Sequence, residues 1–261
     1  MTDVLQDAVA VVTGAGKGIG RHIAVAFARA GATVALAGRD VPALEETQEM
    51  IQALGRSALV TPADICVPEQ VQEMGARVVE QLGRVDALVC NSGVAGPTAP
   101  LWEISLEDWE QTLRVNLTGT FLCCRALLPA MIERRTGSIT VIGSITGKRP
   151  LYGRTPYATS KLALVGLIRT LALEAGAHGI RANVISPGFV AGPRIDRVID
   201  AQAAELKITP EETLDRFISA SPLGRLTAPE DVAAVAVFLA SPAAASITGE
   251  DLNAATGVVM Y

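Results

Sequence analysis

The stretch VVTGAGKGIGRHIAVAFARAGA, residues 11–32, decides the fold. A short β-branched run ends in glycines at positions 14, 18 and 20, in the spacing G-x-x-x-G-x-G, and an apolar helical period follows. Glycine adopts positive φ without steric cost and lets other groups approach the backbone closely. The stretch therefore predicts a strand, a tight turn and a helix in direct succession.

The helix after this turn would offer free backbone N–H groups and the positive end of its dipole to an anion. A glycine cluster alone also suits an ordinary tight turn. Its place between a strand and a helix, at the start of a βαβ unit, favours binding of a dinucleotide pyrophosphate. The candidate contacts in the turn are Gly14, Lys17, Gly18, Ile19 and Gly20.

Short β-branched runs alternate with amphipathic stretches along the rest of the chain. Such alternation predicts a parallel sheet with helices on both faces. We therefore expect an α/β fold, a single-domain Rossmann-type doubly wound parallel sheet of about seven strands. One domain is expected to span residues 1–261. The expected strands are residues 8–13, 33–37, 57–60, 86–90, 138–143, 181–186 and 251–254.

Composition narrows the classes of function. Of the 261 residues, 49% are hydrophobic and only 4% aromatic, which suits a sheet buried on both faces by Ala, Val, Leu and Ile. The formal net charge of −5 argues against a nucleic-acid or acidic-membrane partner, because binding phosphates needs clustered Lys and Arg.

We expect no signal peptide and no apolar run of membrane-spanning length, and hence a cytoplasmic protein. The four cysteines, Cys66, Cys90, Cys123 and Cys124, are then expected to be reduced structural thiols.

A long segment without a strand follows the sequence ISPG at 185–188. An insertion at the carboxyl end of a late strand is where a substrate lid would lie, and we expect such a lid at about 189–226, although a plain surface excursion is the alternative. The sequence TPEE at 209–212 carries the signals of a helix start. Phe189 and Phe217 are the main candidates for an apolar wall of the lid.

The end of the second strand bears on the choice of dinucleotide. An acid there would bind the adenosine ribose and repel a 2′-phosphate, but the sequence reads Gly38 followed by Arg39. Arg39, with Lys17 from the glycine turn, suits the extra phosphate of NADP. Asp40 could instead cap the next helix or reach a ribose hydroxyl. NADP(H) is therefore favoured, with NAD(H) as the alternative.

The sequence YATSK places Tyr157 and Lys161 four positions apart, on one face of a helix. A phenol has a pKa of about 10, and a neighbouring ammonium together with the positive ring of an oxidised nicotinamide favours the phenolate. A tyrosine adjusted in this way can donate or accept a proton at a carbonyl or alcohol oxygen. Ser144, 13 residues upstream, would hydrogen-bond the same oxygen.

With TGAGKGIG, CNSG, VN, Ser144 and YATSK in this order, the chain resembles a short-chain dehydrogenase/reductase of the roughly 250-residue type. The resemblance runs from Val9 to about Gly257 and implies a catalytic tetrad of Asn116, Ser144, Tyr157 and Lys161. The cofactor-binding residues that it implies or that the turn predicts are Gly14, Lys17, Gly18, Ile19, Gly20, Arg39, Asp64, Ile65, Asn91, Gly93, Tyr157, Lys161, Pro187, Gly188 and Val190.

The chain departs from the family pattern in places. Ser92 stands in the asparagine turn, and Gly192 lies near the place where the family often has a threonine that bonds the nicotinamide carboxamide. The C-terminal sequence NAATGVVMY replaces the usual aspartate-glycine-glycine. The helix that starts at YATSK is apolar nearly all round, and the resemblance implies a homotetramer through it and its neighbour at about 105–132.

The expected function is interconversion of a ketone and a secondary alcohol, with 3-oxoacyl compounds, sugars or polyols, and hydroxylated rings as possible substrates. No metal is expected. The cations of the lid and of the loop before Tyr157 would suit an anionic substrate, although solvated surface charge is the commoner reason for such residues; they are Lys148, Arg149, Arg154, Arg194, Arg197, Lys207 and Arg216.

A non-enzymatic dinucleotide sensor on the same fold is the alternative from another class, and the Tyr-Lys pair weighs against it. A serine hydrolase fails because His22 and His178 lie far from any base position and there is no G-x-S-x-G turn.

Overall fold

The computed structural model describes residues 3–261, which form a parallel sheet between two layers of helices. The sheet has seven strands in the order β3-β2-β1-β4-β5-β6-β7, and every neighbouring pair is parallel. The strands are β1 Val9–Thr13, β2 Thr33–Gly38, β3 Ala58–Pro62, β4 Ala87–Cys90, β5 Gly137–Ile142, β6 Ile180–Pro187 and β7 Asp251–Ala254. The predicted fold class is therefore confirmed, with each strand within two residues of its expected ends.

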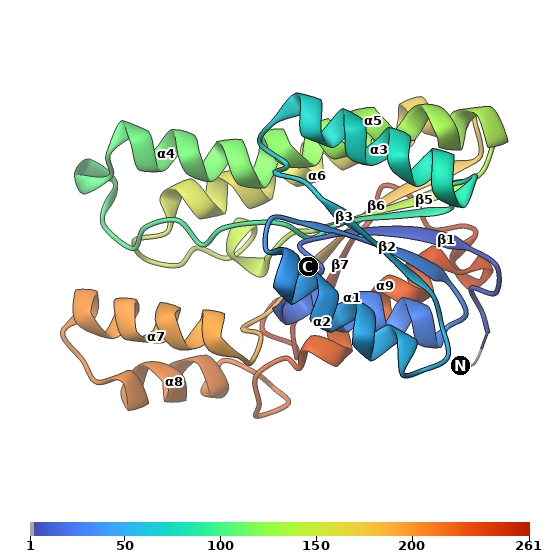
Figure 1. Cartoon of the computed structure of the whole chain (residues 1–261). Helices are drawn as coiled ribbons and strands as arrows, with labels where there is room; N and C mark the ends of the chain where they lie inside the picture. The colour runs from blue at the N-terminus through green and yellow to red at the C-terminus, as the bar shows by residue number, and fades with distance from the viewer. Residues whose placement is uncertain (1–2) are drawn as a thin grey trace.

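Helices cover both faces of this sheet (Figure 1). Helices α3, α4, α5 and α6 lie on one side, and α1, α2 and α9 lie on the other. The helices are α1 Gly18–Arg29, α2 Val41–Gln52, α3 Pro68–Leu82, α4 Leu106–Leu113, α5 Gly119–Arg134, α6 Thr155–Gly176, α7 Pro193–Leu206, α8 Pro210–Ser219 and α9 Pro229–Ala240.

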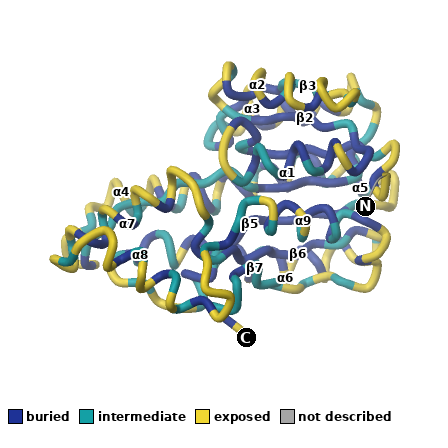
Figure 2. Tube along the Cα trace, turned by 90° about the horizontal axis from the view of Figure 1, so that it is seen from below, coloured by how far each residue is buried: buried dark blue, intermediate teal, exposed yellow. Residues whose placement is uncertain are grey.

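Alternating side chains of each strand feed two separate cores. Along β1, Val9 and Val11 pack toward α3, α5 and α6, whereas Ala10 and Val12 pack toward α1 and α9. Burying a Val, Leu or Ile side chain stabilises a fold by about 1.5–3 kcal/mol. Figure 2 shows the strands as an almost continuous dark blue, buried layer. The apolar, aromatic-poor composition is thus explained by a sheet that helices cover on both faces, with only the edge strands β3 and β7 partly exposed.

The strand order reverses between β1 and β4, because the chain first winds outward to β3 and then crosses back to β4. In open parallel sheets a crevice forms at the carboxyl ends of the strands at such a switch point, and ligands bind there. The glycine turn follows β1 at this edge, and the segment CNSG includes the end of β4.

Helices α7 and α8 project from the body beyond the carboxyl edge of the sheet (Figures 1 and 2). Their own small core contains Phe189 and Phe217, whose rings stack 3.9 Å apart between centroids, together with Ile195 and Ile199. Helix α8 begins at Pro210, and Thr209 with Glu212 forms a full capping box, as the sequence TPEE predicted. The two helices lie within the segment expected to form a lid.

Helices α4 and α5 join through a π-helical turn, Arg114–Thr118, into one helix of 29 residues. It is long and apolar enough to cross a membrane by length and composition, so the expectation of no such run is wrong on that criterion. In the structure 44% of its most apolar window is buried, with Leu127 and Met131 in the core under the sheet. A core helix of a soluble protein passes the same test.

All four cysteines are free thiols. Cys90, Cys123 and Cys124 are buried together in the core beside α5, and hydrogen bonds with the other two thiols, together with burial, raise the pKa of Cys90 well above its usual range. Cys66 is only partly buried.

Candidate active site

A long cleft of about 1110 Å³ runs along the carboxyl edge of the sheet. Arg39 and Asp64 line one end, the glycine turn lines the middle, and Ser144, Tyr157 and residues of α7 line the other end. Fourteen of the fifteen residues predicted to bind the cofactor line this cleft, and Gly20 is the exception. Ser144, Tyr157 and Lys161 of the predicted tetrad line it as well. The sequence motifs, far apart in the chain, thus meet in one place.

The glycine turn needs its glycines for two different reasons. Gly18 has φ +51°, and within residues 3–261 nothing lies within 4 Å of the position that a Cβ would take, so its backbone is open to the cleft. A Cβ on Gly20 would instead collide with the Gly14 carbonyl and the Asn91 amide. Gly20 therefore serves the close packing of the turn against α1, which is why it does not line the cleft itself.

Asn91 holds the turn against the end of β4. Its Nδ2 donates to the Thr13 carbonyl at 3.0 Å and to the Gly14 carbonyl at 3.3 Å, and its backbone N–H donates to Thr13 Oγ1 at 3.0 Å. The residue that the sequence placed under the cofactor is therefore a brace between β1 and β4. Ser92 also donates its N–H to Thr13 Oγ1, at 3.1 Å, so the departure from the family turn leaves this brace intact.

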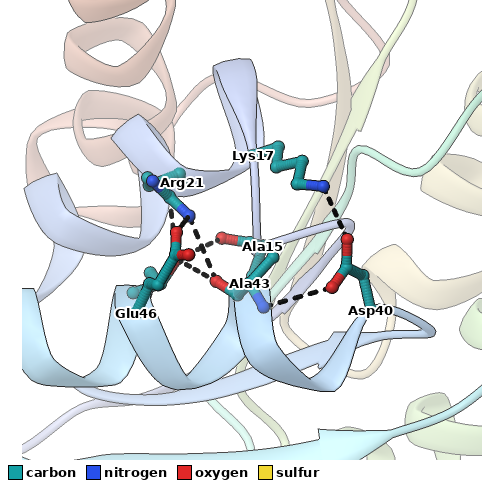
Figure 3. Close-up of polar contacts among 7 residues, drawn as sticks. Ala15, Lys17, Arg21, Asp40, Ala43 and Glu46 are labelled. Atoms are coloured by element: carbon teal, nitrogen blue, oxygen red, sulfur yellow. Dashed lines mark hydrogen bonds and ion pairs between the residues drawn. The ribbon is translucent and has the colours of Figure 1, made fainter.

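Two cations stand at the adenosine end of the cleft, each beside an acid. Lys17 Nζ lies 2.6 Å from Asp40 Oδ2 (Figure 3), and Arg39 Nη1 lies 3.5 Å from Asp64 Oδ2. The side chains of Lys17 and Arg39 are 73% and 70% exposed. Exposed ion pairs contribute little to stability, about 0–1 kcal/mol, so a bound anion can displace the acids.

Asp40 caps α2, one of the two roles left open by the sequence. Its Oδ1 accepts a hydrogen bond from the Ala43 N–H at 3.2 Å (Figure 3). The hydrogen bond from Lys17 and that from Ala43 lower the pKa of Asp40. At Asp64, burial raises the pKa, but the Cys66 N–H and the Arg39 charge outweigh it and the net shift is downward. Both acids are therefore ionised at neutral pH.

Helix α1 is tied to α2 by Arg21 (Figure 3). Arg21 donates to Glu46 at 2.6 Å, to Thr47 Oγ1 at 3.1 Å and to the Ala43 carbonyl at 3.3 Å. These contacts fix the direction of the α1 N-terminus, and hence where its free N–H groups point.

Tyr157 and Lys161 lie on one face of α6, as their spacing predicted. Lys161 is buried, with Nζ 5.8 Å from the Tyr157 ring centroid, and it donates to the Ile142 carbonyl at 2.8 Å. Burial raises the pKa of Tyr157, but the charges of Lys161 and Arg194, a hydrogen bond from Ser144 and the charge of Arg154 together lower it below its usual range. Burial lowers the pKa of Lys161, and Tyr157 opposes that shift.

Ser144 stands two residues beyond β5, where it begins a short 3₁₀ turn, Ile145–Gly147. Its Oγ accepts a hydrogen bond from the Thr146 N–H at 3.1 Å, which leaves its own proton for a partner across the cleft. The Tyr157 phenol is such a partner, since a hydrogen bond from Ser144 is among the causes that lower its pKa.

Asn116 is fully buried in the π-helical turn, outside the cleft lining. Its Oδ1 accepts from the Val94 N–H at 2.8 Å, and its Nδ2 donates to the Val94 carbonyl at 3.1 Å and to Ser160 Oγ at 3.0 Å. Ser160 in turn donates to the Tyr157 carbonyl at 2.8 Å. The Asn116 side chain thus joins the loop after β4 to the helix that carries Tyr157 and Lys161.

Pro187 is the last residue of β6, Gly188 follows it, and both line the cleft. The Gly188 N–H donates to the Ala254 carbonyl at 3.0 Å, and a Cβ at Gly188 would meet Ala255 Cα and Thr227 Oγ1, each at 2.9 Å. Val190 forms an isolated bridge with Thr227. The C-terminal departure from the family pattern therefore still supplies the support for this turn.

The residues present fit a nicotinamide dinucleotide. The cleft is long enough to reach from the acids and cations after β2 and β3 to Tyr157, and the glycine turn leaves backbone open at its middle. Lys17, the residue before α1, directs its side chain to Asp40 rather than over the helix N-terminus, so the first-turn N–H groups remain available to a pyrophosphate.

Three arginines for which solvated surface charge was the commoner explanation belong to the site. Arg154, Arg194 and Arg197 line the catalytic end of the cleft, whereas Lys207 and Arg216 lie outside it. Lys148 pairs with Asp251 at 2.9 Å. Arg154 precedes Tyr157 by one helical turn, and that spacing was the one signal in the sequence that could have identified it. Arg194 donates to the Gly93 carbonyl at 2.6 Å, near the place where the family threonine is missing.

Known proteins match this chain over nearly its whole length. The family model described as enoyl-(acyl carrier protein) reductase matches residues 14–259. A short-chain dehydrogenase/reductase of Armillaria gallica is 39% identical over 267 residues, covering 99% of this chain and 98% of that protein. A (3R)-3-hydroxyacyl-CoA dehydrogenase of Canis lupus familiaris is 38% identical over 265 residues, covering 98% of each.

Among solved structures, NAD⁺-bound xylitol dehydrogenase has a TM-score of 0.93 and 29% identity to this chain, covering 95% of this chain and 98% of that one. Fold, cleft and relatives agree. The chain belongs to the short-chain dehydrogenase/reductase family, and it is an NAD(P)-dependent oxidoreductase that acts on CH–OH groups.

Proposed function

We propose that the protein interconverts a ketone and a secondary alcohol with Tyr157 as the general acid and base. The observation that carries this proposal is the position of Tyr157 in the cleft, with the buried Lys161 ammonium 5.8 Å from its ring centroid and Ser144 in the same lining. A side chain that must exchange a proton near neutral pH needs a pKa moved toward that range, and the charges around Tyr157 move it in that direction.

The bound nicotinamide supplies the hydride. In reduction, Tyr157 donates its proton to the carbonyl oxygen, and Ser144 donates a hydrogen bond that stabilises the charge developing on that oxygen. In oxidation, the Tyr157 phenolate accepts the alcohol proton. Lys161, anchored on the Ile142 carbonyl, stabilises the phenolate.

Asn116 acts in this proposal as a positioning residue. Its side chain holds Val94 and Ser160, and its own carbonyl accepts a hydrogen bond from Thr120 Oγ1 at 3.0 Å. A side chain on Gly93 would press on Asn116 Oδ1 at 3.0 Å and contact Lys161 Nζ at 3.5 Å. The glycine therefore lets these two groups lie together behind the cleft.

The first test is an absorbance assay of nicotinamide oxidation and reduction with ketones, 3-oxoacyl thioesters and polyols. Turnover with a carbonyl or secondary alcohol supports the proposal. Tight cofactor binding without turnover of any of them would favour the alternative, a dinucleotide sensor. The pairing of Tyr157 with the buried Lys161 weighs against a sensor, because binding alone does not require a tyrosine with a lowered pKa.

We propose further that the enzyme prefers NADP(H) to NAD(H). Arg39 and Lys17 flank the end of β2, where a 2′-phosphate would lie, and both side chains are exposed in weak ion pairs that a phosphate can replace. Asp40 is engaged at the α2 N-terminus and with Lys17, which leaves it poorly placed to select the ribose hydroxyl of NAD.

Replacing Arg39 tests this preference. Arg39→Ala should raise KM for the 2′-phosphorylated cofactor by about tenfold, the loss of one charge-assisted contact, and leave KM for the other nearly unchanged. Arg56→Ala is the matched control, since Arg56 pairs with Asp3 away from the cleft. Wild-type kcat/KM that is higher with NADH than with NADPH would contradict the preference.

The substrate in this proposal is a polyol or sugar, a 3-oxoacyl compound, or a hydroxylated ring compound. The relatives named for 3-hydroxyacyl-CoA and xylitol lend support to the first two. We propose that the segment 189–226 is a substrate lid, because α7 lines the catalytic end of the cleft and carries a separate small core. We also propose a cytoplasmic homotetramer.

A further inference from the structure

Arg154 is a buried guanidinium that lies against the Tyr157 ring. It is only 4% exposed, and its central carbon lies 5.0 Å from the ring centroid. Nη1 donates to Thr98 Oγ1 at 3.0 Å and Nη2 donates to the Ala95 carbonyl at 2.7 Å. Nε is buried and finds no hydrogen-bond partner anywhere in residues 3–261. The side chain lines the cleft and keeps donor capacity unused.

Neutral acceptors do not compensate a buried charge. A cation removed from water costs free energy unless an anion pairs with it. None of the ion pairs among the described residues joins Arg154 to an acid. Burial lowers the pKa of Arg154, and the neighbouring Tyr157 opposes this shift. Among the described residues the buried Arg154 charge therefore has no anionic partner, and an anion bound beside the Tyr157 phenol would supply one.

Charge is divided unequally along the cleft. In the described chain its only acidic lining residues are Asp40 and Asp64, at the adenosine end. The catalytic end has Arg154 in its wall and Arg194 and Arg197 on α7, both exposed. Arg194 already reaches across to the Gly93 carbonyl at 2.6 Å. An anion on Arg154 would therefore face further cations from the lid.

We propose that the substrate is a short oxo acid, with the corresponding hydroxy acid as its reduced form, whose carboxylate binds Arg154 with Arg194 and Arg197 closing over it. This inference rests on the proposed oxidoreductase reaction. Because Arg154 contacts the ring that carries the exchanged proton, only a few bonds separate the carboxylate from the reacting carbon. Leu151, Ile195 and Val198 supply apolar lining for the rest of the substrate.

The chemical balance is that of the proposed reaction. The carbonyl carbon gains a hydride from the reduced nicotinamide cofactor, and the oxygen gains the Tyr157 proton, so the oxo acid is reduced to a hydroxy acid. The carboxylate takes no part in bond making. Arg154 is a specificity residue that also favours the phenolate.

The test compares acids with neutral analogues of the same shape. The wild-type enzyme is assayed with 2-oxobutanoate, 3-oxobutanoate and 4-oxopentanoate, with the methyl ester of each, and with the N-acetylcysteamine thioester of 3-oxobutanoate. We expect kcat/KM for at least one acid to exceed that of its ester by about 100-fold, the size of a desolvated charge pair. The acid with the highest ratio gives the spacing between carboxylate and carbonyl.

Turnover of the esters or the thioester as fast as the acids would overturn this inference and leave the proposed function standing. If the enzyme turned over none of the acids and no neutral ketone or polyol, the proposed function would be overturned, and the inference with it. The two failures are therefore distinguishable.

Arginine variants locate the effect. Arg154→Gln should lower the acid-to-ester ratio of kcat/KM by about 100-fold, mainly by raising KM for the acid. If the substitution also shifts the pKa of Tyr157, that shift affects the acid and the ester equally and cancels in the ratio. If that variant does not fold, Arg197→Ala, exposed on the lid, should lower the ratio by about tenfold. Arg216→Ala, exposed on α8 outside the cleft, is the control. An unchanged ratio in Arg197→Ala and in any folded Arg154→Gln enzyme would overturn the assignment.

Discussion

At the scale of single residues, the chemistry depends on how charges around Tyr157 offset its burial. Burial raises the pKa of this phenol, whereas Lys161, Arg194, the Ser144 hydroxyl and Arg154 lower it, and the lowering prevails. Lys161 comes from the same helix, but the two arginines come from the helix start and from the lid. The position of α7, which carries Arg194, therefore contributes to the acidity of the catalytic group.

Oxidation of a neutral secondary alcohol should consequently rise with pH, with a midpoint below the ordinary tyrosine value of 10.0. The sign follows from the reaction, because oxidation needs the phenolate and a lowered pKa makes it available at lower pH. Arg194→Gln removes one of the charges that lower this pKa, so the midpoint of log kcat/KM against pH should move to higher pH.

The control for this profile is Arg216→Gln, which changes an exposed lid residue outside the cleft. Its midpoint should match that of the wild type. A midpoint that stays in place in Arg194→Gln would show that the lid charge does not act on the phenol.

The residues of the site could be predicted where the motif itself is local. The spacing of Tyr157 and Lys161 fixed their common helix face, and the glycine spacing fixed the turn. The burial of Arg154 could not be predicted, since it depends on Thr98 and Ala95 in a distant loop. The ion pairs of Lys17 and Arg39 could not be predicted either, because the acid in each pair follows a different strand from the one that its cation follows.

At the scale of elements, helices α7 and α8 pack mainly against each other, around a small core separate from the two cores beside the sheet. Its core consists of Phe189, Ile195, Ile199 and Phe217, with a few partly buried neighbours. A segment with a small core of its own opens at lower free-energy cost than the central strands. The capping box at Thr209 then contributes a sizeable part of the local stability of α8.

Removing this cap should loosen the lid selectively. Thr209→Ala loses the side-chain oxygen that accepts from the Glu212 N–H at 3.1 Å, at a cost of about 1 kcal/mol. Amide hydrogen exchange in α8 should then be about fivefold faster, with the central strands unchanged.

Ser105→Ala is the matched variant, because Ser105 caps α4 by accepting from the Asp108 N–H at 3.0 Å. It should speed exchange in α4 and leave α8 as it was. Equal acceleration in both helices by either variant would contradict a lid that opens as its own unit.

Elements with strong periodicity or start signals were predictable, as β1 to β7 and the start of α8 show. The π-helical turn at Arg114–Thr118 was not, since its sequence RVNLT carries no breaker. What fixes Asn116 there is tertiary: the amide hydrogen bonds to both polar backbone groups of Val94.

At the scale of the whole molecule, α6 carries an exposed, partly apolar strip on its outer side. Leu162 and Leu173 are 52% and 84% exposed and are separated by three helical turns, with exposed Gly166, Arg169 and Thr170 between them. Phe121 on the neighbouring α5 is 44% exposed. Large exposed apolar side chains on adjacent helices mark association surfaces, and the small Gly166 lets another helix approach closely.

The proposed tetramer should therefore depend on this strip. Light scattering of the wild type should give about four times the chain mass of 27.2 kDa. Leu173→Glu places a charge on the most exposed leucine of this strip and should shift the mass toward dimer or monomer. Leu54→Glu, at an exposed leucine just beyond α2, should not. A wild-type monomer would contradict the assignment of the strip.

The central claim is that the Tyr157 phenol exchanges the proton with the substrate oxygen. Tyr157→Phe keeps the ring and its packing against Arg154 and removes only the hydroxyl. The measurement is nicotinamide binding by fluorescence beside single-turnover reduction of a ketone in the same preparation. We predict an unchanged Kd for the cofactor and a rate at least about 10³-fold lower, within the usual contribution of general acid–base catalysis. Turnover within about tenfold of the wild-type rate, with binding intact, would contradict it.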